Sequence, residues 1–325
     1  METYLPYCLD SLLVSNHQDS LDVLIVNDGS KDGTLAIAQK YVANYPELFR
    51  VIDKRNGNYG SCINAALPLA TGKYVKVLDA DDSFDTANFE KFLEFLSDTD
   101  ADLVLSDFTW VDSERNKLRD TTYSLGRTIL PMDEACVQDG FKNMEMHAVT
   151  YRKKMLIDAG YRQTEGISYT DQQWIFAPMA YVRQVGVFNK SVYQYMVGRV
   201  GQTVDPEVKL RRMKDRVLYV IDMIKQYDTL NLFVSKEIKG YLDARIYPNI
   251  KDIYITYFTN REKVNRQLVY DFDVNFNKSS ESLYYRLGNS NRYIKLWRQI
   301  TKCKATEFLF CKVFSVIFSL RTFIK

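Results

Sequence analysis

The stretch that decides how this chain folds is Val75-Lys76-Val77-Leu78-Asp79-Ala80-Asp81-Asp82. An apolar run with a glycine behind it and three acids ahead of it predicts a buried strand that ends in carboxylates. Three carboxylates at one strand end repel each other, so we expect a cation or the hydroxyls of a ligand between them. Ligands of open α/β sheets bind at the carboxyl ends of the strands. The stretch therefore predicts a hard divalent metal with oxygen ligands, with a phosphate as co-ligand.

Strand-like and helix-like segments alternate on both sides of this stretch. We expect strands at 22–26, 49–52, 74–78 and 103–105, and helices at 5–13, from the turn at 27–30 to about 45, 61–70 and 84–96. This alternation is typical of an α/β fold with a doubly wound, mostly parallel, Rossmann-like sheet.

The rhythm weakens after Phe108, and a new helical region begins near residue 205. Asp205-Pro206 is a helix start, with an acid at the N-cap and proline at the first helical position. We therefore expect one domain at 1–205 and a basic, mostly helical region at 206–325.

The composition is that of an ordinary globular protein, with 46% hydrophobic and 26% charged residues. The net charge of +2 argues against a nucleic-acid binder, although residues 281–325 carry nine lysines and arginines against two glutamates. Five scattered cysteines without a Cys-x-x-Cys, and no signal-peptide pattern, predict reduced thiols in the cytoplasm. With two histidines in the chain, a histidine-based zinc site is not expected, and His147 is given no role.

Two further polar motifs precede the acidic stretch. In Asn27-Asp28-Gly29-Ser30, the carboxylate can accept a hydrogen bond from a base or a ribose hydroxyl, although a plain strand–turn–helix junction explains it equally well. The run from Asn56 to Asn64 holds two glycines and three asparagines, which let a backbone approach a ligand, but this motif is weak because loops commonly use these residues.

Asp79 and Asp81 lie two residues apart, so both could reach one metal-diphosphate if the chain turns at Ala80. The alternative is an acid cluster that stabilises the start of the next helix. Capping a helix needs one acid rather than three, so we favour the binding role.

In their order and spacing, these motifs resemble those of the family 2 inverting glycosyltransferases, which have the GT-A fold. The resemblance rests on Asp28-Gly29-Ser30, on Asn56, Gly60 and Asn64, and on Gly72 through Asp82, and it covers roughly residues 1–200. It is specific as a set, although each motif alone is not. It implies a nucleotide-sugar donor, a UDP-sugar, with Mg²⁺ or Mn²⁺ as cofactor.

The resemblance also implies a role for each matching residue. Asp28 and the loop of Asn58, Gly60 and Asn64 would lie near the base, Asp79 near the ribose, and Asp81 on the metal.

The catalytic base of such enzymes opens a helix, and Asp171 in Gly166-Ile167-Ser168-Tyr169-Thr170-Asp171 matches it. Thr170 replaces the usual glutamate. The alternative is that Thr170 or Asp171 only caps a helix that runs to Met179.

Near the end of the first domain, the run from Tyr195 to Thr203 resembles a closing segment of polysaccharide-synthesising members of the family. Arg199 could contact the diphosphate, and Gln202 and Thr203 could line the site. A structural loop with an exposed arginine is an equal alternative.

The segment 308–324 carries a narrow polar stripe of Lys312, Ser315, Ser319 and Thr322 on an otherwise apolar helix. It is too short and too charged for a membrane span, so it reads as an in-plane anchor at the inner face of the cell membrane. The alternative is a helix docked on the protein's own core or on a second subunit of a homo-oligomer.

The sequence thus predicts a metal-dependent, inverting hexosyltransferase that moves a sugar from a nucleotide donor to a hydroxyl of a saccharide or lipid-linked saccharide in surface-polysaccharide synthesis. Two alternatives remain: an inactive nucleotide- or glycan-binding relative, and a sugar nucleotidyltransferase, which would need a Gly-rich basic N-terminal loop. The resemblance also implies a first sheet strand that has no counterpart before Asp22. We therefore expect that the natural product begins earlier, or that this chain is destabilised.

Overall fold

The computed structural model describes residues 1–199 and 205–323, and side chains as far as residue 320. The chain divides into two units. Unit 1 comprises Met1–Gln202 with Ser235–Tyr241, and unit 2 comprises Thr203–Val234 with Leu242–Lys325. The predicted boundary near residue 205 stays a prediction, and the expected roles of Gln202 and Thr203 lie outside the described residues.

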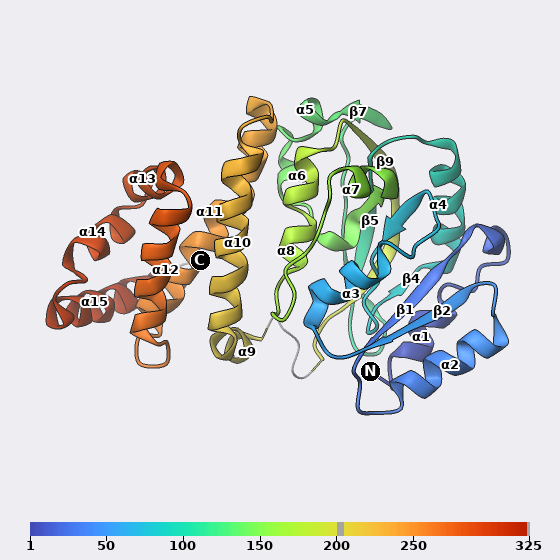
Figure 1. The fold of residues 1–325 in the computed structure, drawn as a ribbon, viewed down its shortest axis with the longest axis horizontal. Coiled ribbons are helices and arrows are strands. Elements are labelled where there is room, and N and C mark those ends of the chain that lie inside the picture. Colours follow the sequence, from blue (N-terminus) through green and yellow to red (C-terminus); the bar gives the residue numbers. More distant parts are fainter. Residues whose placement is uncertain (200–204, 324–325) are drawn as a thin grey trace. The chain divides into compact units, whose positions relative to one another are not determined.

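Unit 1 has the strands of an α/β domain (Figure 1). They are β1 (Val23–Asp28), β2 (Phe49–Lys54), β3 (Tyr74–Lys76), β4 (Ser83–Phe84), β5 (Leu103–Val111), β6 (Lys117–Thr121), β7 (Ile129–Pro131), β8 (Val149–Arg152) and β9 (Gln184–Met196). As expected, no strand precedes Asp22, because Met1–Asp22 contains helix α1 (Leu5–Asp10) and the 3₁₀ turn η1 (Gln18–Ser20).

The strands form two sheets whose pairing is mixed. β1 and β2 make a parallel two-stranded sheet, and a seven-stranded sheet has the order β3-β8-β5-β9-β4 with β6 and β7 beside it. In the larger sheet only β5 and β9 pair in parallel, and the other described pairs are antiparallel. The mostly parallel sheet of the sequence analysis is therefore corrected to a mixed one. Two parallel strands must be joined by a long crossover connection. The short strands in the second half of unit 1 also pair antiparallel, which needs no such crossover.

The remaining elements of unit 1 are short helices. They are α2 (Thr34–Asn44), α3 (Asn58–Ala66), α4 (Thr86–Asp98), α5 (Met132–Ala135), α6 (Asp139–Lys142), η2 (Met146–Ala148), α7 (Lys153–Asp158), α8 (Asp171–Trp174) and η3 (Ala177–Ala180). Helix α4 begins where the Asp85 carboxylate accepts the Asn88 N–H, and it buries Phe89 and Phe92. The helix expected to run to Met179 ends at Trp174, shortly before Pro178.

The core of unit 1 is centred on β5. Eight of its nine residues are buried, because β8 and β9 flank it and helices cover it. A strand covered on both faces reads as a continuous apolar run. This explains why Leu103-Val104-Leu105 was recognisable from the sequence.

Unit 2 is helical, as predicted for the end of the chain. Its helices are α9 (Pro206–Arg211), α10 (Met213–Leu230), α11 (Lys236–Thr259, of which the first residues belong to unit 1), α12 (Arg266–Ser279), α13 (Glu281–Ser290), α14 (Arg292–Ile300) and α15 (Lys304–Phe323). The expected helix start is confirmed, since the Asp205 carboxylate accepts the Glu207 N–H at 2.8 Å. A fully buried carboxylate, Glu307, anchors α15 by accepting hydrogen bonds from Tyr257 and Trp297 and pairing with Arg266.

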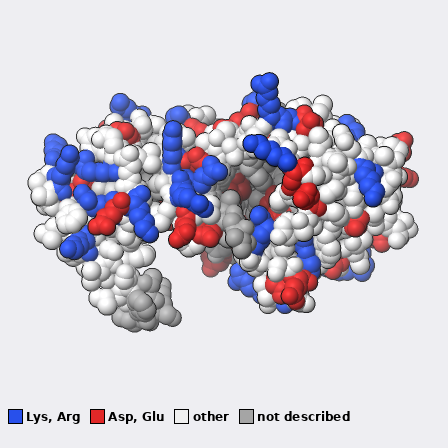
Figure 2. Space-filling model, turned by 90° about the horizontal axis from the view of Figure 1, so that it is seen from below, with Lys and Arg blue, Asp and Glu red and all other residues white. Residues whose placement is uncertain are grey.

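Helix α15 packs on its own unit through one side only. Cys311 and Phe314 are buried, whereas seven large apolar residues are exposed. These are Phe308, Leu309, Val313, Val316, Ile317, Phe318 and Leu320. Within the described residues, no helix has the length and apolar character to cross a membrane. Figure 2 shows lysine and arginine side chains, with some acids among them, over the helices α12–α15 at the left of the view.

Candidate active site

The acidic stretch forms a tight turn between β3 and β4. The Asp82 N–H donates to the Asp79 carbonyl at 2.9 Å, so the chain turns at Ala80, which is the condition for Asp79 and Asp81 to reach one ligand. The Asp82 carboxylate is 1% exposed, and it accepts the Tyr193 hydroxyl at 2.5 Å and the Met196 N–H at 2.7 Å. These two hydrogen bonds from β9, the strand next to β4, hold the turn in place.

Burial disfavours the ionised forms of Asp79 and Asp82, the carboxylates at the two ends of this turn. Desolvation, with repulsion from Asp81 and Asp171, raises the pKa of Asp79 to about 7. Desolvation and repulsion from Asp79 raise the pKa of Asp82 to about 8. A cation beside them would relieve this cost, because an opposite charge favours the ionised form.

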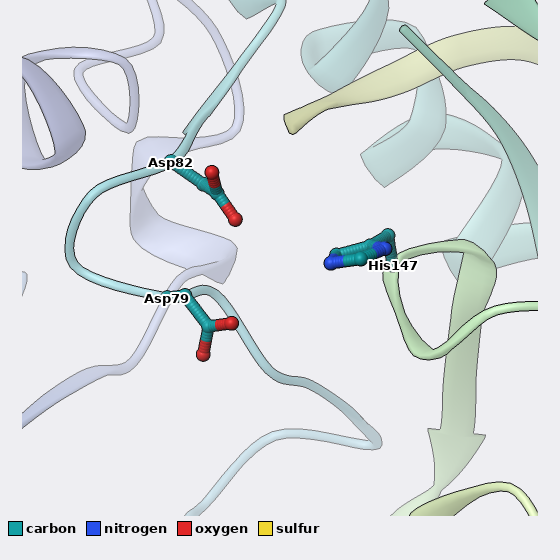
Figure 3. A group of neighbouring side chains, drawn as sticks. All are labelled: Asp79, Asp82 and His147. Atoms are coloured by element: carbon teal, nitrogen blue, oxygen red, sulfur yellow. The ribbon is translucent and has the colours of Figure 1, made fainter. Parts of the chain in front are cut away.

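His147 lies across from these carboxylates, at the 3₁₀ turn η2 that leads into β8 (Figure 3). One ligand atom each of Asp79, Asp82 and His147 lie within 4.8 Å of one another. The ring of His147 is buried against that of Tyr195, with centroids 4.1 Å apart. Its Nδ1 makes no hydrogen bond within the described residues and lies 3.7 Å from Oε2 of Glu145. Two carboxylates and an imidazole, each with one ligand atom in this group, fit a divalent cation.

Asp81, the predicted metal ligand, lies outside this three-residue group. Its Oδ2 is 2.9 Å from Nη2 and 3.1 Å from Nε of Arg199, so the two residues form an ion pair. The Asp81 carbonyl also accepts Arg115 Nη2 at 3.0 Å. The metal role of Asp81 and the diphosphate role of Arg199 stay predictions, but the structure brings the two residues together.

Asp28 lies at the end of β1, next to the end of β2. Its Oδ1 is 2.6 Å from Lys54 Nζ and accepts the Gly57 N–H at 2.9 Å. Lys54 also donates to Ser61 Oγ at 2.8 Å. The carboxylate predicted to contact a base thus links the strand end to the start of α3.

Gly60 and Asn64 contact another loop of the protein. A Cβ at Gly60 would lie 2.0 Å from the Thr164 carbonyl oxygen. The Asn64 side chain donates to the Gln163 carbonyl at 2.8 Å and accepts the Gln163 N–H at 2.9 Å. Asn58 begins α3 with a left-handed φ of 62°. Their donor-binding roles stay predictions; in the structure, Gly60 and Asn64 join α3 to the loop that leads to Asp171.

Asp171 opens α8, with Thr170 before it. The side chain of Thr170 makes no capping hydrogen bond to the helix, so the simple capping alternative is not what this residue does. Burial raises the pKa of both Asp79 and Tyr59, and the negative charge of Asp171 adds to both shifts. Asp171 therefore shares an electrostatic environment with the acidic turn, although 92 residues separate Asp171 from Asp79 in the sequence.

Sequence reasoning missed three residues of the site: His147, Lys54 and Tyr193. Lys54 could have been found, because it lies two residues after the strand expected at 49–52; in the structure it ends β2 and pairs with Asp28. His147 had no motif around it. Tyr193 lies in no motif that the sequence analysis identified, and its contact with Asp82 depends on the pairing of β9 with β4.

The comparisons with known proteins agree with one another on the family that this chain resembles. Residues 2–158 match the family model for glycosyl transferase family 2. An uncharacterized glycosyltransferase of Mycoplasma pneumoniae is 27% identical over 224 residues, 66% of this chain and 71% of the relative. The chondroitin synthase of Pasteurella multocida is 32% identical over 163 residues, 46% of this chain and 17% of that enzyme.

A solved structure of S. aureus TarS residues 1–349 in complex with UDP-GlcNAc has a similar fold. The TM-score is 0.63 at 18% identity, over 98% of this chain and 88% of TarS. The likeness shows the GT-A fold with a helical C-terminal region. Residues 2–158 of the chain thus form a glycosyl transferase family 2 domain of the GT-A fold.

Proposed function

We propose that this protein is an inverting, metal-dependent hexosyltransferase that uses a UDP-sugar and a saccharide hydroxyl. The observation that carries the proposal is the joint presence of a cation-compatible carboxylate turn and a further acid, Asp171, acting electrostatically on Asp79. The relatives support the substrate class: a chondroitin synthase matches in sequence, and TarS binds UDP-GlcNAc.

A divalent cation at this turn supplies charge neutralisation for the leaving diphosphate. Asp79, Asp82 and His147 are the residues that would hold it when no nucleotide is bound. We propose that Arg199 would bind the diphosphate, and that Asp81 would also hold the cation once its ion pair with Arg199 is broken. We expect this change of partners because the single positive charge of Arg199 cannot neutralise both the Asp81 carboxylate and the diphosphate.

Asp171 is the proposed base. It would accept the proton of the acceptor hydroxyl as that oxygen attacks the anomeric carbon and the diphosphate leaves. A single displacement inverts the anomeric centre and needs no second carboxylate as a nucleophile. Asn64 and Gly60 act on this step indirectly, by positioning the loop that precedes Asp171.

A donor screen tests the proposal. UDP release is measured with a panel of UDP-sugars and Mn²⁺ or Mg²⁺, with and without oligosaccharide acceptors. We expect acceptor-stimulated release with one donor and a β-linked product from an α-linked donor, or the reverse. UDP binding without release for any donor would instead assign an inert nucleotide-binding relative, and release of inorganic pyrophosphate from a sugar phosphate and UTP would assign a nucleotidyltransferase.

We further propose that α15 holds the protein at the inner face of the membrane, near a lipid-linked acceptor of surface-polysaccharide synthesis. The exposed apolar residues of α15 and the basic end of the chain support this placement.

Sedimentation with vesicles containing phosphatidylglycerol tests it, with the pair Val313→Glu and Val316→Glu compared with the same change at the exposed Val137 and Val274. The α15 pair is expected to lower the bound fraction several-fold and the control pair to leave it unchanged. If the parent protein is a dimer that binds no vesicles, and the α15 pair of substitutions makes it a monomer, the exposed face of α15 would instead be assigned to contact with a second subunit.

A further inference from the structure

A row of three side chains leads away from the candidate cation site across the larger sheet. Tyr195 of β9, Trp110 of β5 and Arg119 of β6 occupy paired positions on neighbouring strands. The Trp110 and Tyr195 rings meet edge-on with centroids 4.8 Å apart, and the Arg119 guanidinium lies 4.1 Å from the centre of the Trp110 ring. Because Tyr195 also stacks on His147, this row, which we call the platform, begins at His147 and ends on β6.

The platform is accessible to a ligand. Arg119 is exposed, and Trp110 and Tyr195 are only half-buried, whereas the other two tryptophans of the chain, Trp174 and Trp297, are fully buried. Aromatic rings of this kind offer a flat apolar face. The C–H face of a sugar ring packs on such a surface, so the platform suits a saccharide.

Arg119 brings a positive charge to the outer end of the platform. Within the described residues it forms no ion pair, and its ring contact is with Trp110. The neighbouring acid, Asp120, belongs to the other face of β6, where its carboxylate accepts the Thr109 hydroxyl and pairs with Lys117. An arginine that stacks on an indole keeps its in-plane N–H donors for an oxyanion, which guanidinium binds with two parallel hydrogen bonds.

The inner end of the platform has the opposite charge. Desolvation, with the charges of Asp82 and Asp79, raises the pKa of the Tyr195 hydroxyl. The turn η2, which carries His147, contacts both β9 and the helix α8 that Asp171 opens. An anionic group of a ligand is therefore repelled from the inner end and attracted to Arg119, and an uncharged hydroxyl is left to face the acids.

We propose that the platform binds the acceptor, and that this acceptor is a saccharide with an oxyanion, a carboxylate or a phosphate, on the unit that meets Arg119. The inference rests on the proposed transferase function, which leaves the charge of the acceptor open. Trp110 and Tyr195 pack on the sugar rings, and Arg119 pairs with the oxyanion. Together they direct the acceptor so that a hydroxyl, rather than its charge, points toward Asp171.

The experiment measures saccharide binding to the full chain without donor or metal, so it needs no turnover. Since Trp174 and Trp297 are fully buried, a ligand on the platform should change the emission of Trp110 and protect it from quenching by acrylamide. The probes are two matched pairs. One is a tetrasaccharide of alternating glucuronate and N-acetylglucosamine with its carboxyl-reduced form, and the other is maltotetraose 6-phosphate with maltotetraose.

We expect one charged probe to bind roughly tenfold or more tightly than its neutral partner, because a charged hydrogen bond is gained. The pair that shows this preference identifies the oxyanion as a carboxylate or a phosphate. If neither charged probe binds more tightly than its neutral partner, the proposal is overturned. Acceptor-stimulated UDP release with a neutral saccharide would at the same time leave the transferase function standing.

Two variants place the oxyanion. Arg119→Gln should remove the preference for the charged probe and leave Tm and UDP affinity unchanged, because the side chain is exposed and lies at the end of the platform away from His147. Arg183→Gln, at an exposed arginine before the opposite end of β9, is the matched control and should keep the preference. A preference that survives Arg119→Gln, or an emission change that survives Trp110→Phe, would refute binding at the platform.

Discussion

Arg199 and Asp81 form an ion pair at the centre of the candidate site, with Nη2 2.9 Å and Nε 3.1 Å from one carboxylate oxygen. Each was predicted to contact a different part of a metal-diphosphate. We therefore expect Arg199→Ala to have opposite effects on two ligands. Mn²⁺ alone should bind more tightly, because a competing cation is gone, whereas UDP with Mn²⁺ should bind roughly tenfold or more weakly, because a charged hydrogen bond is lost. Calorimetry measures both, and weakening of both would contradict the exchange.

The ligands of the cation can be told apart by a pair of variants. His147→Ala should weaken Mn²⁺ binding in the absence of nucleotide by more than roughly tenfold, since even residues that only orient metal ligands cost that much. Asp81→Asn should leave that binding nearly unchanged and weaken it when UDP is present. Electron paramagnetic resonance of Mn²⁺ reports free metal in each case. The exposed His17→Ala serves as the histidine control.

Mn²⁺ affinity should depend on pH through the acidic turn. Asp79 and Asp82 have pKa values raised to about 7 and about 8, so the metal-free folded protein holds protons that the unfolded chain has already released. The free energy of unfolding should thus fall as pH rises from about 4 through 8 without metal. Because Mn²⁺ competes with these protons, its affinity should rise between pH 6 and 8.5 by up to about tenfold per unit and proton. A flat profile, in a titration repeated at each pH, would exclude these carboxylates as ligands.

Asp171→Asn should remove turnover while preserving donor binding. Loss of a general base costs about 10²–10⁴-fold in rate. The amide keeps the size of the side chain, so UDP affinity and Tm should stay close to those of the parent. Asp158→Asn, at an exposed aspartate of α7, is the control and should retain full activity. Activity within twofold of the parent in Asp171→Asn would refute the assignment of the base.

Gly60→Ala tests the contact between α3 and the loop before Asp171. A Cβ there would meet the Thr164 carbonyl at 2.0 Å, so we expect a loss of about 1–3 kcal/mol in the free energy of unfolding. Gly140→Ala in α6 is the matched control, because nothing lies within 4 Å of its Cβ, and it should be neutral or stabilising by up to ~1 kcal/mol. Urea unfolding gives both values. Equal stability of the two variants would show that the loop moves away at little cost.

The strands and their polar ends were predictable because their signals are local. Buried apolar runs such as Leu103-Val104-Leu105, and turns such as the one at Asp28, need only a few neighbouring residues to be recognised. The ends of helices were less predictable. Helix α3 begins at Asn58, earlier than expected. Asn58 has a left-handed φ, and the Thr164 carbonyl of another loop packs on Gly60. The local sequence does not report this contact with a distant loop.

The sequence by itself determined the α/β class, the acidic turn and the family, because periodicity and motif spacing are properties of the chain alone. Only the tertiary structure decided which side chains share a site. It placed His147 opposite Asp79 and Asp82, bonded Tyr193 to Asp82, and paired Arg199 with Asp81. The physical reason is that strand pairing over more than 60 residues creates these contacts, and burial at that junction, rather than any local pattern, raises the pKa values of the carboxylates.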